Sequence, residues 1–408
     1  MWQLTRSIKI IKEEGFGVWF SAVKQYLEET KGKNKVSKIN LDHWNYITDY
    51  VKNEKKPFLP KPQKGEIPTL NWIIPPFGKG SGGHLNIFRY IFLLEKMGYF
   101  NRIYVFGQTG FNSPDEAKIF IQKNFFPINS EIHLSTDNIA NSDGIIATSW
   151  ETAYVVNTIG NCYKKFYFIQ DYEPNFFPKG SESFFAENTY RFDLHRITMG
   201  PWISDLLHKN FYLKSDYLEF GYDPKIYGKN PPDLNRKSNN HIFFYSRPAT
   251  ARRCFDLGLL ALKELNRRGI EFKLFTVGQE IHNYDLPFTA NNLGILTLEE
   301  LGKLYSNTDL GLVFSSTNTS LLPFEMMASG CPVIELKSPS NSITFPNPEI
   351  IRLADPNPIG IADAIEELLK DEQKRKHQIQ TAYEYVSGMT WEKSAEKLDQ
   401  IIRRILED

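Results

Sequence analysis

The sequence predicts an α/β protein with two doubly wound, Rossmann-like domains that face a common cleft, preceded by a helical N-terminal extension. The chain has 408 residues, enough for two domains of about 150 residues and one smaller segment. Short apolar runs alternate with helical stretches, as in parallel sheets that are covered by helices on both faces. This alternation stops at a link rich in Pro and Asn, residues 230–235, and then begins again.

Residues 1–66 are predicted to form the helical extension. Apolar residues recur at roughly helical spacing between Ile8 and Leu27, and two glycines divide this run into two short helices. A further helix is expected at about residues 42–52, and prolines between 57 and 68 then indicate an extended linker.

The first domain is expected at residues 67–220. Its strands are predicted at 70–74, 104–106, 132–134, 144–148, 166–170 and 196–199, and its helices at 84–97, 114–124 and 201–209. In such sheets ligands bind beyond the carboxyl ends of the strands.

The second domain is expected at residues 221–386. Its strands are predicted at 241–245, 272–277, 310–314 and 332–334, and its helices at 254–268, 298–305, 322–329, 358–370 and 371–386. A last helix, at about 391–406, makes up a closing segment at 387–408. Two facing halves of this kind place the expected active site in the cleft between them.

Composition narrows the classes of function. Lys plus Arg and Asp plus Glu both number 48, and this balance argues against a nucleic-acid partner. The three cysteines show no metal-binding spacing and suit a reducing cytosol. No run reaches the roughly 18 apolar residues of a membrane span, and Glu13–Glu14 interrupt any signal-peptide core. We therefore expect a cytoplasmic protein without a metal.

A glycine-rich turn, Gly80-Ser81-Gly82-Gly83-His84, follows the first strand. Glycines let the backbone approach a ligand closely, and the next helix offers free N–H groups to an anion. The spacing is not that of nicotinamide enzymes. His84 is a candidate acid, base or hydrogen-bond donor, and the ordinary alternative for the whole segment is a tight strand-to-helix turn.

Three arginines, Arg247, Arg252 and Arg253, follow the first strand of the second domain. Guanidinium groups match phosphate geometry and are costly to bury unpaired, so this loop suits a diphosphate. A solvated basic loop is the alternative.

A loop rich in hydroxyl and amide groups, residues 315–320, precedes the helix that contains Glu325. Thr319, Ser320 and Leu321 stand at the start of that helix, where backbone N–H groups favour phosphate. Glu325 is a candidate acceptor for hydrogen bonds from a nucleoside sugar, or else a carboxylate that the helix dipole favours.

These segments together resemble the nucleotide-sugar signature of retaining GT-B glycosyltransferases. The matching residues are Pro-x-Glu at 323–325, Ala-x-Gly-x-Pro-Val at 328–333, the pair Arg247 and Arg252, and Gly-Tyr-Asp at 221–223. The resemblance covers about residues 70–408. It implies that Gly278, Gly294, Ile295 and Leu296 surround the donor base.

Residues 168–174, the pair Arg247-Pro248 and the helical extension are similar to rhamnosyltransferases of the WsaF type. This resemblance implies transfer of L-rhamnose from dTDP-β-L-rhamnose, with retention, onto an oligosaccharide or lipid-linked glycan in surface polysaccharide synthesis. No cofactor is implied. Thr317 departs from the pattern, because the signature has a Glu eight residues before Glu325.

The implied mechanism uses fixed positive charge. Arg247, Arg252 and the start of the helix at Thr319 would stabilise the leaving diphosphate, with Gly82 and Gly83 closing from the first domain. The family implies that the leaving phosphate itself deprotonates the acceptor. Asp171 and Glu173 would orient sugar hydroxyls, with Asp171 also a candidate base; loop carboxylates that cap the next turn are the alternative for both.

Other functions stay open at this point. A sugar-nucleotide epimerase needs a denser acid–base set than His84, Asp171 and Glu173 provide. Thr317 is the main support for a non-catalytic saccharide-binding or scaffold subunit of a polysaccharide assembly system. The extension is a lid on the first domain, a contact for a long acceptor, or an amphipathic anchor at the inner face of the plasma membrane; we favour packing with acceptor contact.

Overall fold

The computed structural model describes residues 44–52, 59–61, 67–229, 231–282 and 284–408. Helix α3, Asn45–Lys52, falls within the expected range of 42–52. The other helices predicted for the extension, between residues 8 and 27, lie outside the described residues. Both sheets belong to one compact unit that begins at Asp49.

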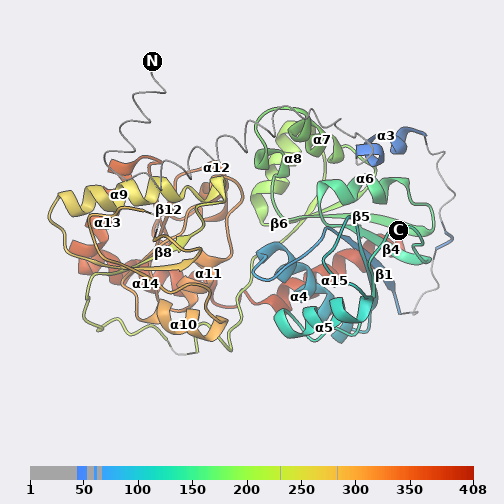
Figure 1. The fold of residues 1–408 in the computed structure, drawn as a ribbon. Helices are drawn as coiled ribbons and strands as arrows, with labels where there is room; N and C mark the ends of the chain where they lie inside the picture. Colours follow the sequence, from blue (N-terminus) through green and yellow to red (C-terminus); the bar gives the residue numbers. More distant parts are fainter. Residues whose placement is uncertain (1–43, 53–58, 62–66, 230, 283) are drawn as a thin grey trace, which may run out of the picture. The chain divides into compact units, whose positions relative to one another are not determined.

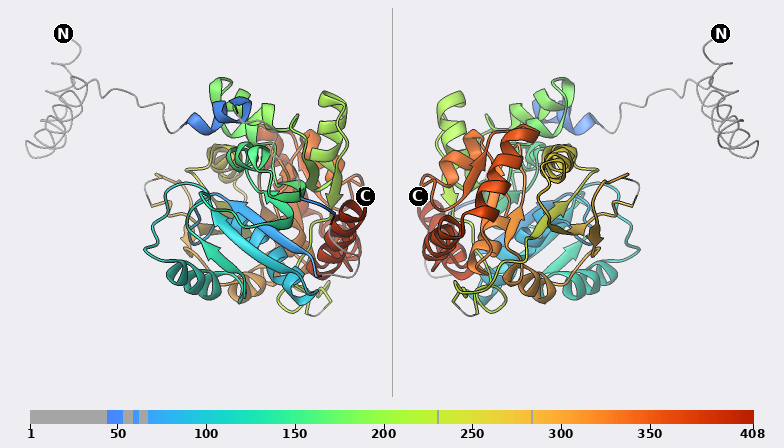
Figure 2. Two further views of the ribbon diagram at one scale, coloured as in Figure 1. Left: turned by 90° about the vertical axis from the view of Figure 1, so that its right-hand side faces the viewer. Right: turned by 90° about the vertical axis from the view of Figure 1, so that its left-hand side faces the viewer.

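The first sheet has seven parallel strands in the order β3-β2-β1-β4-β5-β6-β7. They are β1 Thr69–Ile74, β2 Phe100–Val105, β3 Glu131–His133, β4 Ser142–Ala147, β5 Cys162–Ile169, β6 His195–Met199 and β7 Asp216–Leu218. The connecting helices are α4 Gly82–Lys96, α5 Pro114–Asn124, α6 Trp150–Thr158, α7 Ser181–Thr189 and α8 Pro201–Phe211, with a 3₁₀ turn, η2, at Glu173–Phe176. Helices cover both faces of this sheet (Figures 1 and 2).

The second sheet has six parallel strands in the order β10-β9-β8-β11-β12-β13. They are β8 His241–Ser246, β9 Lys273–Gly278, β10 Ala290–Asn292, β11 Leu310–Leu312, β12 Val333–Leu336 and β13 Arg352–Ala354. The remaining elements are η3 Ala251–Arg253, α9 Phe255–Arg267, α10 Leu298–Ser306, α11 Leu322–Ala328, α12 Pro339–Thr344, α13 Pro358–Lys370 and α14 Glu372–Val386. Two parallel sheets confirm the predicted α/β class of doubly wound domains.

The last helix, α15 Trp391–Glu407, packs on the first domain although it follows the second in sequence (Figure 1). The buried Tyr90 hydroxyl lies 2.7 Å from Oγ of Ser394, and the guanidinium of Arg89 lies 4.1 Å from the ring centroid of Trp391. All four of these residues are nearly inaccessible to solvent. The helix therefore links the end of the chain to α4 through buried contacts.

Local sequence explains where several elements begin. The Ser113 hydroxyl accepts a hydrogen bond from the Glu116 N–H and so caps α5. Ser149 and Thr152 form a capping box at the start of α6, and Thr297 and Glu300 form another at α10. Elements that the sequence did not predict are α6, α7, α12 and the three-residue strands β7, β10 and β13.

Candidate functional site

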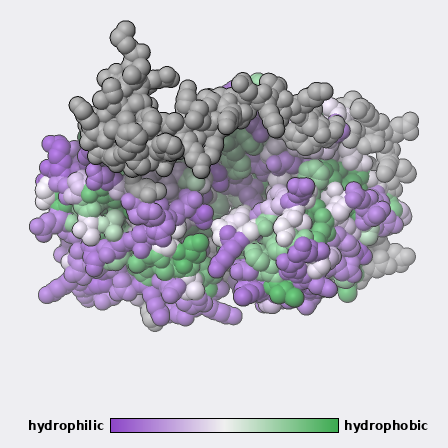
Figure 3. Space-filling model, in the orientation of Figure 1, coloured by the Kyte–Doolittle hydropathy of each residue, from purple (hydrophilic) through white to green (hydrophobic). Residues whose placement is uncertain are grey.

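A cleft of about 510 Å³ lies between the two domains, and the surface is hollowed there (Figure 3). It is lined by residues that directly follow β1, β4, β5 and β8: Pro75, Thr148, Gln170 and Arg247. The strand ends of both sheets thus meet at one cavity, as expected for ligand sites of doubly wound sheets. The lining also includes most of the residues predicted for a site: Ser81, Gly82, Gly83, His84, Asp171, Glu173, Arg247, Arg252, Arg253, Thr319, Ser320 and Leu321.

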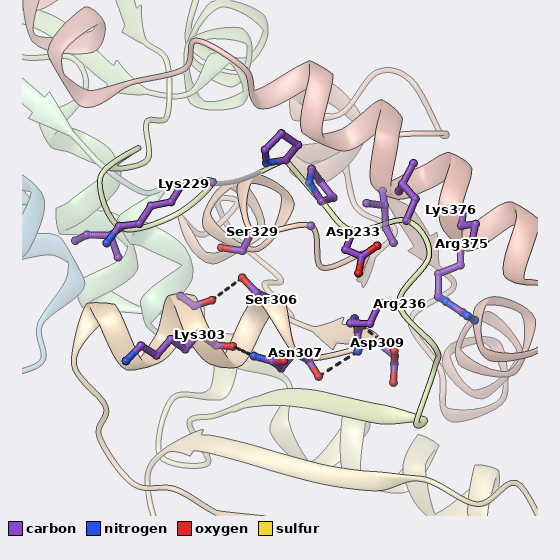
Figure 4. A pocket seen from close by; sticks show the side chains of 18 of the residues that line it. Lys229, Asp233, Arg236, Lys303, Ser306, Asn307, Asp309, Ser329, Arg375 and Lys376 are labelled. Carbon is purple, nitrogen blue, oxygen red and sulfur yellow. Dashed lines mark hydrogen bonds and ion pairs between the residues drawn. The ribbon is translucent and has the colours of Figure 1, made fainter.

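A second cavity, of about 540 Å³, lies between the interdomain link, α10 and α14 (Figure 4). Most of its basic side chains are bonded to neighbours. Arg236 pairs with Asp309 at 2.8 Å, Lys376 pairs with Glu372 at 2.8 Å, and Arg375 donates to carbonyl groups at the end of α13. These charges stabilise the second domain, so the cleft is the better candidate for a functional site.

Arg247 contacts both domains. Its Nε donates to the Tyr245 hydroxyl at 2.8 Å, and its Nη2 donates to the Gly80 carbonyl of the first domain at 3.1 Å. Gly80 has a φ of 80°, a left-handed conformation that favours glycine. The contact fixes the glycine-rich turn against the arginine loop, so the two predicted phosphate-binding segments lie on opposite sides of one cleft.

Donor atoms without hydrogen-bond partners gather in this cleft. Arg252 Nε, Arg253 Nη1 and Ser320 Oγ are buried, and none has a hydrogen-bond partner within the described part of the chain. Burial lowers the pKa of Arg252, and the nearby Asp171 opposes this shift. Buried donors without partners are costly, and an anion with several acceptor oxygens would satisfy them. The arrangement therefore fits a phosphate or diphosphate group.

Asp171 joins the two domains. Its Oδ2 accepts a bond of 2.9 Å from the Thr317 hydroxyl, and its Oδ1 accepts one of 3.0 Å from the Asn318 N–H. Arg252 Nε lies 3.7 Å from Oδ2. Burial raises the pKa of Asp171, while the Asn318 N–H and the Arg252 charge oppose the shift. Because both oxygens are engaged by the protein, the carboxylate is suited to positioning rather than to taking a proton from a substrate.

Glu173 stabilises the start of α6. Its Oε2 accepts a bond of 2.6 Å from the Trp150 N–H, and its own N–H donates to the Tyr190 hydroxyl at 3.1 Å. Burial raises the pKa of Glu173 well above its usual range, and Glu151 adds to the shift. This geometry matches the alternative role of a capping carboxylate.

His84 has protein partners at both ring nitrogens. Nε2 lies 3.2 Å from the Pro75 carbonyl. Because a carbonyl only accepts, the neutral ring carries its proton on Nε2. Nδ1 then accepts a hydrogen bond of 2.7 Å from the Ser81 hydroxyl. Burial lowers the pKa of His84. The neutral ring orders the glycine-rich turn, and acid–base work would require one of these bonds to break.

Four of the residues predicted around the donor base lie outside the cleft lining. Gly278 is the last residue of β9, and Gly294, Ile295 and Leu296 follow β10. The Gly278 N–H donates to the Gly294 carbonyl at 2.8 Å. Ile295 is largely exposed. Their contact with a base stays a prediction.

Glu325 also lies outside the cleft lining. Its carboxyl is buried beside Arg89 and Tyr227, and burial raises its pKa to about 7. Its predicted bond to a nucleoside sugar has no support from this position. Thr319 lines the cleft, but its hydroxyl donates to Asn341 Oδ1 at 2.7 Å inside the second domain.

Two further residues shape the site: Asn318, which the sequence did not single out, and Phe176, for which it left stacking on a sugar ring or core packing open. Asn318 donates through Nδ2 to the carbonyls of Gln170 at 2.8 Å and Met199 at 3.1 Å, in addition to its bond to Asp171. Phe176, at the end of η2, lies under the Arg252 guanidinium, which is 4.4 Å from the ring centroid. Both contacts cross between domains, and no local pattern in the sequence predicts them.

Neither a metal cluster nor a membrane-spanning helix is found among the described residues. They contain no group of three or more His, Cys, Asp or Glu side chains that would hold a metal ion. No helix among them is both long enough and apolar enough to cross a membrane.

Family models match much of the chain. One described as the N-terminal domain of WsaF matches residues 113–200, and one described as its C-terminal domain matches residues 240–366. The O-antigen biosynthesis protein RfbC of Myxococcus xanthus is 29% identical over 352 residues, which are 84% of this chain and 27% of that protein. The D-inositol 3-phosphate glycosyltransferase of Corynebacterium diphtheriae is 34% identical over 105 residues, 25% of each chain. The chain spans about a quarter of the length of these curated relatives.

Solved GT-B structures share the fold. HepE of Anabaena, in complex with UDP and glucose, has a TM-score of 0.65 at 15% identity, with 82% of this chain and 99% of that chain covered. The sucrose-phosphate synthase of Thermosynechococcus elongatus has a TM-score of 0.63 at 13% identity, with 83% and 99% covered. At such low identity the likeness concerns the fold, which is the one that the sequence predicted.

Proposed function

Because this chain belongs to the WsaF family and has the GT-B fold, we propose that it is a glycosyltransferase that moves a sugar from a nucleoside diphosphate to a saccharide hydroxyl. The observation that carries the proposal is a set of buried donor atoms of Arg252, Arg253 and Ser320 in one interdomain cleft, which have no hydrogen-bond partner among the described residues. A leaving diphosphate needs such donors, fixed in place before the reaction.

The proposed donor is dTDP-β-L-rhamnose, and the proposed product is part of a cell-surface polysaccharide. Family membership supports this sugar, and the Myxococcus xanthus relative named for O-antigen biosynthesis supports the pathway class. The Anabaena structure contains UDP and glucose, which supports a nucleotide sugar in this cleft without favouring one base. No cofactor belongs to the proposal, and we place the reaction on the cytoplasmic side of the membrane.

The proposed reaction proceeds with retention. Arg252 and Arg253 stabilise the charge that grows on the diphosphate as the bond to the sugar breaks, and Arg247 positions the glycine-rich turn. The leaving phosphate accepts the proton of the acceptor hydroxyl. The bonding of Asp171, Glu173 and His84 supports this route, because each of these groups already has protein partners.

The first experiment is a thermal-shift panel of dTDP, UDP, GDP, CDP and ADP without added metal. A ligand that binds only the folded state stabilises it by about 2.7 kcal/mol at 100 times its dissociation constant. Selective stabilisation by dTDP supports the rhamnosyl donor, whereas selective stabilisation by UDP or GDP keeps the transferase and removes rhamnose. Stabilisation by none of them contradicts the proposal.

Turnover distinguishes the enzyme from the second candidate, a non-catalytic saccharide-binding subunit. The observation that favours the latter is Thr317 at the position where the GT-B signature has a Glu. Release of dTDP from dTDP-β-L-rhamnose, measured with and without an oligosaccharide acceptor, is expected for the enzyme. Nucleotide binding without release would favour the binding subunit.

A further inference from the structure

We propose that Phe176 is a positioning residue for the donor diphosphate: from the first domain, its ring orients the Arg252 guanidinium of the second domain toward the phosphates. This inference rests on the proposed function of the cleft as a nucleoside-diphosphate site. It goes further, because it assigns the placement of a second-domain arginine to a side chain of the first domain. Every guanidinium in the cleft lining belongs to the second domain.

The side chain of Arg252 contacts two groups of the first domain. Its Cζ lies 4.4 Å from the Phe176 ring centroid, within the range of a cation–π interaction, and its Nε lies 3.7 Å from Asp171 Oδ2. Neither contact uses the hydrogen-bond capacity of Nε, which has no hydrogen-bond partner in the described ranges. The ring therefore restricts the guanidinium while its N–H groups stay available for an anion.

The ring itself is placed by the hydrogen bonds that fix its turn. Phe176 ends the turn η2, which begins at Glu173. That turn is fixed by the bond from the Trp150 N–H to Glu173 and by the bond from the Glu173 N–H to the Tyr190 hydroxyl. The Asn175 N–H adds a bond of 3.0 Å to the Tyr172 carbonyl. Because the turn is held by these hydrogen bonds, the side chain of Phe176 is fixed at the wall of the cleft although it is 41% exposed.

Such an arrangement affects nucleotide affinity through entropy. A free arginine samples many rotamers, and ordering it on binding reduces affinity. An arginine that already stacks on a ring loses less freedom when phosphate binds. Removal of the ring should therefore weaken nucleotide binding, although Phe176 need not touch the nucleotide.

The test compares two exposed phenylalanines that each lie under a cation. Phe184 has Lys179 Nζ at 4.4 Å from its ring centroid and is outside the cleft lining, so it is the matched control. We measure Kd by calorimetry on the full chain, for the nucleoside diphosphate that stabilises the parent most in the panel. Phe176→Leu should raise Kd about tenfold, equivalent to about 1.4 kcal/mol, whereas Phe184→Leu should leave it unchanged.

A second variant separates the ring from its bulk. Phe176→Tyr keeps the aromatic face and should keep Kd within about twofold of the parent. With acceptor in excess and donor varied, Phe176→Leu should raise KM for the donor more than it lowers kcat. Both substitutions are at an exposed side chain, and thermal midpoints within about 2 °C of the parent would show that they fold.

Three results would overturn the inference: an unchanged Kd for Phe176→Leu, an equal loss for Phe184→Leu, or an equal loss for Phe176→Tyr. These outcomes differ from a failure of the proposed function, in which the parent itself binds no nucleoside diphosphate.

Discussion

The Thr317 hydroxyl donates a hydrogen bond of 2.9 Å to Oδ2 of Asp171, and this bond connects the second domain to the first. Thr317 is buried, with an exposed fraction of 3%. The GT-B signature that the sequence resembles has a Glu here. The carboxylate next to position 317 thus comes from Asp171 on the opposite domain, and a small hydroxyl donor at 317 is what that carboxylate requires.

Thr317→Glu should therefore impair the protein rather than restore a conventional motif. The new carboxylate would be buried beside Asp171, and two like charges at such a distance cost several kcal/mol. We expect kcat/KM for donor turnover to fall by about 10- to 100-fold, equivalent to about 1.4–2.7 kcal/mol. Steady-state release of the nucleoside diphosphate measures the effect.

Thr317→Ser is the control, because it keeps the hydroxyl donor and should keep most of the activity. Asp171→Asn combined with Thr317→Glu should recover at least part of the loss, since one carboxylate then remains. Activity of the Thr317→Glu single variant at or above the parent level would contradict this account.

Arg252→Ala should lower kcat/KM by about 10²–10³, as loss of one fixed donor to a developing anion does in comparable sites. Arg252→Lys should recover only part of this loss, because an ammonium cannot reproduce the planar geometry of guanidinium. Arg267, an exposed residue that pairs with Glu264 on α9, provides the control. An Arg252→Ala variant as active as Arg267→Ala would remove the phosphate role.

The sequence allowed much of the fold to be predicted, because most elements show local periodicity. The helix expected at 114–124 is Pro114–Asn124, and the strand expected at 70–74 is Thr69–Ile74. Three edge strands were missed, β7, β10 and β13, whereas the edge strand β3, Glu131–His133, was predicted from its apolar run at 132–134. Helix α6 was missed because its buried residues do not form a single apolar stripe.

The candidate site was predicted only where chemistry is local in sequence. The arginine loop and the glycine-rich turn do line one cleft, since each follows the end of a strand. Asp171 and Thr317 are 146 residues apart, and their hydrogen bond depends on how the two domains pack. No local pattern in the sequence indicates such a contact. Glu325 shows a second limit, because a motif does not indicate which face of a short helix is buried. The carboxyl of Glu325 lies beside Arg89.

Glu335→Gln should stabilise the protein at alkaline pH. Glu335 is fully buried on β12; its Oε1 accepts from the N–H groups of Ser315 and Leu336, and burial raises its pKa to about 8. The unfolded value is about 4.3, so between about pH 4.3 and 8 the folded state binds a proton that the unfolded state does not. Stability of the parent should therefore fall as pH rises through this window.

Thermal midpoints measured from pH 5 to 8.5 test this sign. The midpoint of Glu335→Gln relative to the parent should rise with pH and level off above about pH 8. Glu264→Gln is the control: bonds from Arg267 and Arg268 lower the pKa of Glu264 to about 2, so its effect should be constant above about pH 5. A pH-independent difference for Glu335→Gln would contradict the assignment.

Gly278→Ala should destabilise the second domain more than Gly294→Ala does, although both glycines have positive φ and the N–H of Gly278 donates to the carbonyl of Gly294. At Gly294, with φ of 64°, an added Cβ would meet no atom within 4 Å in the described part of the chain, so only the left-handed backbone costs energy, about 1–2 kcal/mol. At Gly278, with φ of 124°, a Cβ would lie 2.2 Å from the Ser246 carbonyl oxygen, which is backbone and must move.

Displacement of Ser246 also affects the site, because Arg247 is the next residue and contacts Gly80 across the cleft. We expect the midpoint of Gly294→Ala to fall by about 2–8 °C, at about 2–4 °C per kcal/mol for a domain of this size, and that of Gly278→Ala to fall further. Gly278→Ala should also raise Kd for the nucleoside diphosphate, whereas Gly294→Ala should do so only if its loop contacts the base. Equal midpoints for Gly278→Ala and Gly294→Ala would show that β8 moves without a cost in stability. The close approach of Gly278 to Ser246 would then not explain why glycine stands at position 278.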